Sequence, residues 1–245
     1  MTIKTPRFII FNFLMVMGCL LVLMSVTIDA TAQRKKVQNL PKYDKQRIHF
    51  GFLLGINNTD FVIRRADNFN KIDTLYTVES TSQTGFNLGI IANLHLAENF
   101  DLRFVPDLAF SQRNLEYTFY PDGIKTTTIK QIESTLLEFP LELKFKSNRV
   151  NNYRVYVIAG AKYSIDMVSQ AKVESADKEF VKLKKNDYGY QVGFGFDFYL
   201  ERFKFSPEIK MYNGLRNLLV DDPKVFSTSI ESLKSKIFLI SFTFE

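Results

Sequence analysis

Hydrophobic and polar side chains alternate with a period of two along most of this 245-residue chain. In one run, Phe194, Phe196 and Phe198 alternate with Gly195 and Asp197. Eight runs share the pattern: 48–57, 86–96, 100–111, 137–146, 153–166, 188–200, 203–211 and 238–244. Side chains of a β-strand point alternately to opposite faces, and a strand that crosses a bilayer needs about 9 to 11 residues. The alternation predicts an all-β fold, an eight-stranded antiparallel up-and-down transmembrane β-barrel formed by residues 47–245.

The connections between these runs separate a barrel from a soluble β-sandwich, in which strands also alternate. Three connections are short: 97–99, 147–152 and 201–202. Three are long and polar (58–81, 168–186 and 213–232), and residues 114–134 are expected to lengthen a hairpin. Short turns on one rim and long loops on the other are typical of outer-membrane barrels. We therefore predict a multi-pass barrel in the outer membrane, surrounded by its lipid, with both termini in the periplasm.

In the predicted strands, the polar residues of the alternating pattern, which would face the lumen, include fully charged side chains. Six of these residues are expected to form a polar network in the lumen: Arg103, Glu138, Glu142, Lys144, Arg154 and Asp197. Paired carboxylates such as Glu138 and Glu142 can also act as general acid and base. Because Arg103 and Arg113 lie on the same face of the preceding strand, ion pairing is favoured. Eight strands leave an interior just wide enough for side chains, so we expect a filled lumen and no protein conduit.

Few residues of the chain suggest catalytic or metal chemistry. His49 and His95 share the inward parity near the short turns, with Asp101 close by, and either bind a metal or proton or simply pack in the lumen. Zinc sites take three or four protein ligands, so packing is favoured. The chain has one Cys, and no G-x-S-x-G, P-loop or HExxH pattern occurs. We predict no enzyme activity, no catalytic residue, no cofactor, no metal ion and no small-molecule substrate.

The N-terminus has the features of a secretory signal. Lys4 and Arg7 precede an apolar run at 8–26, and small residues form an A-x-A site. We predict a signal peptide over residues 1–32, with the cleavage site marked by Ala30, Ala32 and Gln33. An uncleaved membrane anchor is the alternative, because the apolar run is long. Residues 33–46 then form a basic periplasmic N-terminal segment that either contacts a partner or acts as a spacer.

The C-terminal run resembles the assembly signal of outer-membrane barrels. The apolar residues of its alternating pattern are Phe238, Ile240, Phe242 and Phe244. Glu245 follows the last Phe, which departs from the commonest form of that signal.

The formal charge of +6 is compatible with nucleic-acid binding, but the dense basic run 34–36 is too short for a nucleic-acid groove, and an exported chain rarely meets nucleic acid. We therefore predict no nucleic-acid partner.

Several segments of the chain resemble the PorT family. They are NLPKYD (39–44), HFGFLLGIN (49–57), LRFVP (102–106), FSQR (110–113), ESTLLEFPL (133–141), RVNNYR (149–154) and AGAKY (159–163). Members of this family are outer-membrane barrels of Bacteroidetes that the type IX secretion system requires, and that system exports proteases, adhesins and gliding-motility proteins. The resemblance implies a non-enzymatic role in anchoring or assembling the secretion machinery, with other type IX components as partners. The alternative is a general small outer-membrane barrel with structural or adhesive loops.

Overall fold

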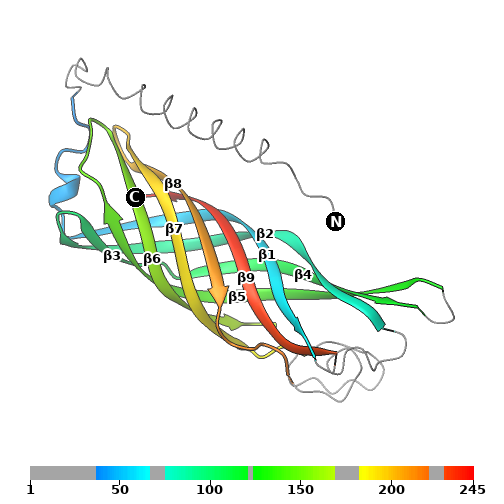
Figure 1. The fold of residues 1–245 in the computed structure, drawn as a ribbon. Coiled ribbons are helices and arrows are strands. Elements are labelled where there is room, and N and C mark those ends of the chain that lie inside the picture. Colours follow the sequence, from blue (N-terminus) through cyan, green and yellow to red (C-terminus); the bar gives the residue numbers. More distant parts are fainter. Residues whose placement is uncertain (1–36, 67–74, 121–123, 169–181, 221–228) are drawn as a thin grey trace, which may run out of the picture. The chain divides into compact units, whose positions relative to one another are not determined.

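The computed structural model describes residues 37–66, 75–120, 124–168, 182–220 and 229–245. Its strands are β1 (Ile48–Arg65), β2 (Leu75–Ala97), β3 (Phe100–Phe104), β4 (Asp107–Phe119), β5 (Thr126–Lys146), β6 (Tyr153–Asp166), β7 (Asn186–Tyr199), β8 (Lys204–Gly214) and β9 (Ile230–Phe244). Neighbouring strands pair antiparallel, and β1 pairs with both β2 and β9. The sheet therefore closes into a ring (Figure 1). The predicted signal peptide and its cleavage residues lie outside the described residues.

Within the described ranges, no helix is long and apolar enough to cross a membrane.

Strands β3 and β4 together occupy one position in the ring. Both pair with β2 on one side and with β5 on the other. They are separated by Val105 and Pro106, and a proline has no N–H to donate. The ladder nevertheless continues, because Val105 N donates to Pro140 O at 3.2 Å and Ile90 N donates to Pro106 O at 3.0 Å. The ring thus has eight wall positions, and the predicted fold class is confirmed.

The interior of the ring carries charges, whereas its outer wall carries large apolar side chains. Arg103 and Glu142 are 0% exposed, but Phe50 is 74% exposed. Aromatic rings stack on the outer wall in the pairs Phe52–Phe244, Phe86–Phe110 and Phe205–Phe242. A soluble protein distributes these residue classes in the opposite way, and a barrel in lipid needs an apolar outer band. This inverted burial excludes the soluble sandwich.

The strands extend beyond the predicted runs at the end of the ring that carries the long connections, called here the long-loop end. The prediction of a loop over residues 58–81 was wrong, because β1 continues to Arg65 and β2 begins at Leu75. Outside lipid a strand can be polar on both faces, so hydrophobic alternation does not mark it. The predicted β4–β5 hairpin also projects from the ring (Figure 1).

An apolar cluster fills the interior at the long-loop end. Its buried members are Phe61, Leu75, Val78, Leu115, Tyr117, Leu183, Leu218, Leu219, Ile230 and Leu233. Seven of them fall in stretches that were predicted to be polar loops, and three of these seven lie outside the strands: Leu183, Leu218 and Leu219. These leucines pack against the extended strands, so the described parts of the long connections help to close this end.

Candidate functional site

A network of eight charged side chains fills the lumen towards the end that carries the short turns, called here the short-turn end. Its members, the central network, are Arg103, Lys144, Lys204, Lys210, Glu142, Asp197, Glu208 and Glu245. Arg103 Nη1 lies 2.5 Å from Glu208 Oε1 and 3.8 Å from Glu142 Oε2. Lys210 Nζ lies 2.8 Å from a carboxylate oxygen of each of the same two glutamates. Four cations thus face four carboxylates, and their formal charges cancel.

The remaining members join the network through shared polar neighbours. Lys144 Nζ lies 2.8 Å from Asp197 Oδ1 and 3.5 Å from the centre of the Tyr156 ring. The hydroxyl of Tyr156 donates to Glu208 Oε1 at 2.7 Å. Since a buried charge is stable only when it is paired and hydrogen-bonded, this arrangement explains how the lumen tolerates so many ionised groups.

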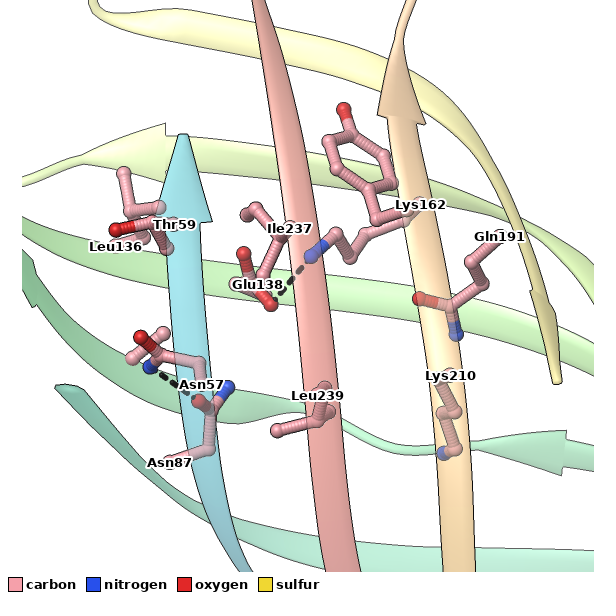
Figure 2. Close-up of a pocket in the computed structure, with 12 residues that line it drawn as sticks. Asn57, Thr59, Asn87, Leu136, Glu138, Lys162, Gln191, Lys210, Ile237 and Leu239 are labelled. Atoms are coloured by element: carbon pink, nitrogen blue, oxygen red, sulfur yellow. Dashed lines mark hydrogen bonds and ion pairs between the residues drawn. The ribbon is translucent and has the colours of Figure 1, made fainter. Parts of the chain in front are cut away.

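A small cavity lies between the central network and the long-loop end, and Figure 2 shows the side chains around it. Lys162 Nζ and Glu138 Oε2 form an ion pair of 2.7 Å on its wall, and Asn57 Nδ2 donates to Asn87 Oδ1 at 2.6 Å. The cavity measures about 10 Å³, which is room for about one water molecule. It is therefore too small for an organic ligand.

Arg113 lies closer to the long-loop end and is separate from the ion pairs. It was expected beside Glu138 and Glu142, but its guanidinium donates to Ser235 Oγ at 3.2 Å and Ser134 Oγ at 3.3 Å. No carboxylate of the described residues lies within ion-pair distance of it, so the expected pairing of Arg113 was wrong. The reason is register, because Arg113 is opposite Ile132 on β5, several residues beyond Glu138.

An N-terminal latch, residues 39–45, lies across the short-turn end and includes the 3-10 helix η2 (Tyr43–Lys45). The Tyr43 ring stacks on His49 with a centroid separation of 3.9 Å, and its hydroxyl donates to Glu245 Oε2 at 3.0 Å. Burial raises the pKa of the Tyr43 hydroxyl, which keeps the donor protonated. Burial alone would raise the pKa of the Glu245 carboxyl, but Lys204 and Arg103 hold it below its ordinary value.

The rest of the latch is bound to the turns and strand ends of the barrel. Asp44 Oδ1 accepts hydrogen bonds from Arg154 Nη1 at 3.2 Å and from the Tyr199 hydroxyl at 3.0 Å. Asn39 donates through Nδ2 to Tyr199 O at 3.0 Å and through its backbone N to Asn152 Oδ1 at 2.9 Å. The described part of the predicted segment 33–46 therefore covers one end of the lumen, and it is neither a bare spacer nor fully available to a partner.

The two histidines have separate hydrogen-bond partners. His49 Nε2 contacts Tyr43 O at 2.8 Å, and His95 Nδ1 contacts Asp101 Oδ1 at 2.8 Å. Lys146 Nζ lies 2.7 Å from the same Asp101 oxygen. No group of three His, Cys, Asp or Glu that could hold a metal ion occurs among the residues with described positions.

The structure distributes the six predicted lumen residues over three places. Arg103, Glu142, Lys144 and Asp197 belong to the central network, Glu138 pairs with Lys162, and Arg154 binds the latch. Sequence reasoning left out Lys204, Glu208 and Lys210, although the alternation of run 203–211 placed them on the polar face. It also missed Glu245, whose side chain is 1% exposed. The predicted assembly residues Phe238, Ile240, Phe242 and Phe244 lie along β9 on its outward parity.

The closed ring, its apolar wall and its charged interior agree with a comparison of sequences. The sequence model of a family described as "Outer membrane protein beta-barrel domain" matches residues 31–220. The chain belongs to this family. Its members sit in membrane lipid, and family and fold together support an outer-membrane location for this barrel. A search of curated proteins finds no match.

Solved structures similar to this outer-membrane barrel include three further outer-membrane or surface proteins. OprG from Pseudomonas aeruginosa is 13% identical, with a TM-score of 0.44 over 81% of this chain and 96% of that chain. Neisserial surface protein A is 11% identical, with a TM-score of 0.41 over 81% and 98%. The outer membrane protease OmpT from Escherichia coli is 10% identical, with a TM-score of 0.43 over 86% and 97%.

Proposed function

We propose that this barrel is a non-enzymatic outer-membrane anchor that supports protein secretion without being the conduit. The observation that carries the proposal is the closed lumen. The latch covers the short-turn end, the central network fills the lumen next to it, and the apolar cluster fills the long-loop end. A moving substrate would have to separate buried ion pairs, which costs about 3 to 5 kcal/mol for each one that is broken. The barrel can therefore act only through its two ends and its outer wall.

The secretion system that we propose is the type IX system, in which the protein would anchor or help to assemble the machinery. The resemblance to PorT, which runs through the segments between residues 39 and 163, supports this choice. In this proposal both termini and the short-turn end face the periplasm, so the latch would lie on the side where periplasmic secretion components act. The long-loop end would face outward.

Cargo localisation in a deletion strain tests the proposal. We expect cargo with the type IX C-terminal signal to accumulate inside cells that lack the protein. The intact gene should restore secretion, and a version with the projecting part of the β4–β5 hairpin shortened should restore it as well, because the proposed contacts are at the other end. Normal secretion in the deletion strain would refute the proposal.

A second candidate is a structural or adhesive barrel that acts through its projecting hairpin. The observation that favours it is an exposed aromatic pair whose ring centres are 5.1 Å apart beyond the apolar band: Tyr76 on β2 and Tyr120 directly after β4. This candidate predicts normal secretion and altered surface binding in the deletion strain. The hairpin-shortened version would then behave like the deletion.

We further propose that residues 1–32 are removed and that the mature chain begins at Gln33. The small residues Ala30 and Ala32 support this site. The N-terminus of protein purified from outer membranes, measured by mass spectrometry, should start at Gln33. An N-terminus at residue 1 would favour the uncleaved anchor.

We also propose that the outward residues Phe238, Ile240, Phe242 and Phe244 act as the assembly signal, in which case Phe244→Ala should reduce the amount of folded barrel in the membrane.

A further inference from the structure

Two lysines on the outer wall stand directly beyond the apolar band at the long-loop end. From the C-terminal end of β9 towards its start, the outward-facing residues are apolar as far as Phe238, and the next two are Lys236 and Lys234. The residues that flank them in the chain, Leu233, Ser235 and Ile237, are buried inside the ring. Both lysines therefore extend from the outer wall, next to the surface that faces lipid.

Neither lysine has a carboxylate partner among the described residues. Asp60 lies opposite Lys236 in the pairing of β1 with β9, but its Oδ1 accepts a hydrogen bond from Phe61 N at 2.7 Å. Lys234 lies opposite Val62. Two ammonium groups thus remain available for a ligand at the edge of the band.

Charges of opposite sign are separated around the wall at this end. Beyond the band, β1 and β9 carry three cations (Lys234, Lys236 and Arg64) and two carboxylates (Asp60 and Glu231), and Arg64 pairs with the exposed Glu231 at 2.8 Å. The outer faces of β2, β4 and β5 carry acidic residues instead: Glu79, Glu116 and Glu133. Of the described parts of these five strands, the β1–β9 side therefore has the excess of positive charge that attracts an anion at the level where lipid headgroups begin.

We propose that Lys234 and Lys236 bind the phosphate group of a lipid in the leaflet that surrounds the long-loop end. The continuity of the lysine pair with the apolar band identifies a membrane lipid as the ligand, because acyl chains can lie along Phe238 and Ile240 while the phosphate meets the ammonium groups. Lysine side chains reach from apolar surfaces to charged headgroups, and each contributes about 1 kcal/mol to such binding. The inference rests on the proposed membrane placement with the long-loop end outward, but not on the role in secretion.

Native mass spectrometry of the full-length mature barrel in detergent tests this site. The probe is diphosphoryl lipid A, and the same lipid without its phosphates is the reference. The variant Lys234→Gln/Lys236→Gln removes the pair, and Lys45→Gln/Lys125→Gln is the matched control, because it removes two exposed lysines outside β9, one at the short-turn end and one at the β4–β5 hairpin. A heat-dependent gel-mobility shift checks that each protein is folded.

We expect the site variant to bind diphosphoryl lipid A about 30-fold more weakly than the intact protein, which corresponds to two lysine contacts. The control variant should bind diphosphoryl lipid A as strongly as the intact protein does. The intact protein should bind the dephosphorylated lipid only weakly. Rising salt should weaken binding of the intact protein, which gives a readout that needs no variant. Equal binding by the site and control variants, equal binding of the two lipids, or displacement of the lipid by equimolar inorganic phosphate would overturn the proposal. The secretion assay does not depend on this result, so either proposal can fail alone.

Discussion

Replacement of Arg103 by Met should strongly destabilise the barrel. The guanidinium is 0% exposed and lies 2.5 Å from Glu208, 3.8 Å from Glu142 and 3.8 Å from Glu245. Removal of one partner from a buried ion pair costs about 3 to 5 kcal/mol. We expect about 3 kcal/mol, because Lys210 and Lys204 remain next to the three carboxylates. The Met side chain fills a similar volume, so the loss measures charge rather than a cavity.

Urea unfolding of the refolded barrel in liposomes measures this loss. The chain has no Trp, so tyrosine fluorescence and the heat-dependent gel shift are the suitable probes. Arg202→Met makes the same chemical change at an exposed turn and should leave stability unchanged. The double variant Arg103→Met/Glu208→Gln should recover about 1 kcal/mol or more, since it removes one unbalanced carboxylate. A loss below about 1 kcal/mol for Arg103→Met would refute the view that this balance of charges stabilises the lumen.

Three further predictions concern the latch and the lumen wall. Tyr43→Phe removes the hydrogen bond to Glu245 and should cost about 1.5 to 3 kcal/mol in urea unfolding. Gly195→Ala should cost about 1 to 3 kcal/mol, because its methyl group would lie 2.5 Å from the Tyr156 hydroxyl oxygen. The pKa of Glu245 is lower in the folded protein than its ordinary value of 4.5, so its stabilising effect is complete above that pH and is lost as the pH falls through the lowered pKa. The stability difference between the intact protein and Glu245→Gln should therefore shrink below about pH 4.5.

Each of these predictions has a result that contradicts it. For the latch, it is unchanged stability in Tyr43→Phe together with unchanged trypsin cleavage at Lys42 and Lys45. For the wall, it is a Gly195→Ala barrel as stable as the comparison variant Gly214→Ala, whose added methyl group would lie 3.0 Å or more from its nearest neighbours. For the carboxyl, it is a stability difference that stays constant between pH 6 and pH 3.

The wall of the barrel was predictable because each strand separates lipid from lumen, so the two-residue period of the backbone appears directly in residue type. The pairing of Arg103 with Glu142 was also within reach, because they are neighbours in the β3–β5 register. The pairing of Arg103 with Glu208 was not. These residues lie on opposite walls and are 105 positions apart in the chain, and nothing in the alternation tells which side chains meet across the interior.

The latch and the strand extensions left no periodic signal. Residues 39–45 contain one turn of 3-10 helix, Tyr43–Lys45, which has no buried face, and their contacts are with distant strands. The outer side of the β1 and β2 extensions faces water instead of lipid, so polar residues occur on both faces of these strands. Glu245 was read as a departure from the assembly signal, but its buried carboxylate is a partner of Lys204 and Arg103.

The binding surface of the latch has a consequence for the order of folding. Its contacts come from β1, β6 and β7, from the turn before β6 and from Glu245 directly after β9, so the surface does not exist until the first and last strands have paired. Tyr43 and Glu245 are 202 residues apart in sequence, and Asn39 and Tyr199 are 160 apart. Contacts of this separation form late, because the chain entropy of such loops is lost before the contacts stabilise them. Protection of the latch from protease would thus report, in a single readout, that the whole ring has closed.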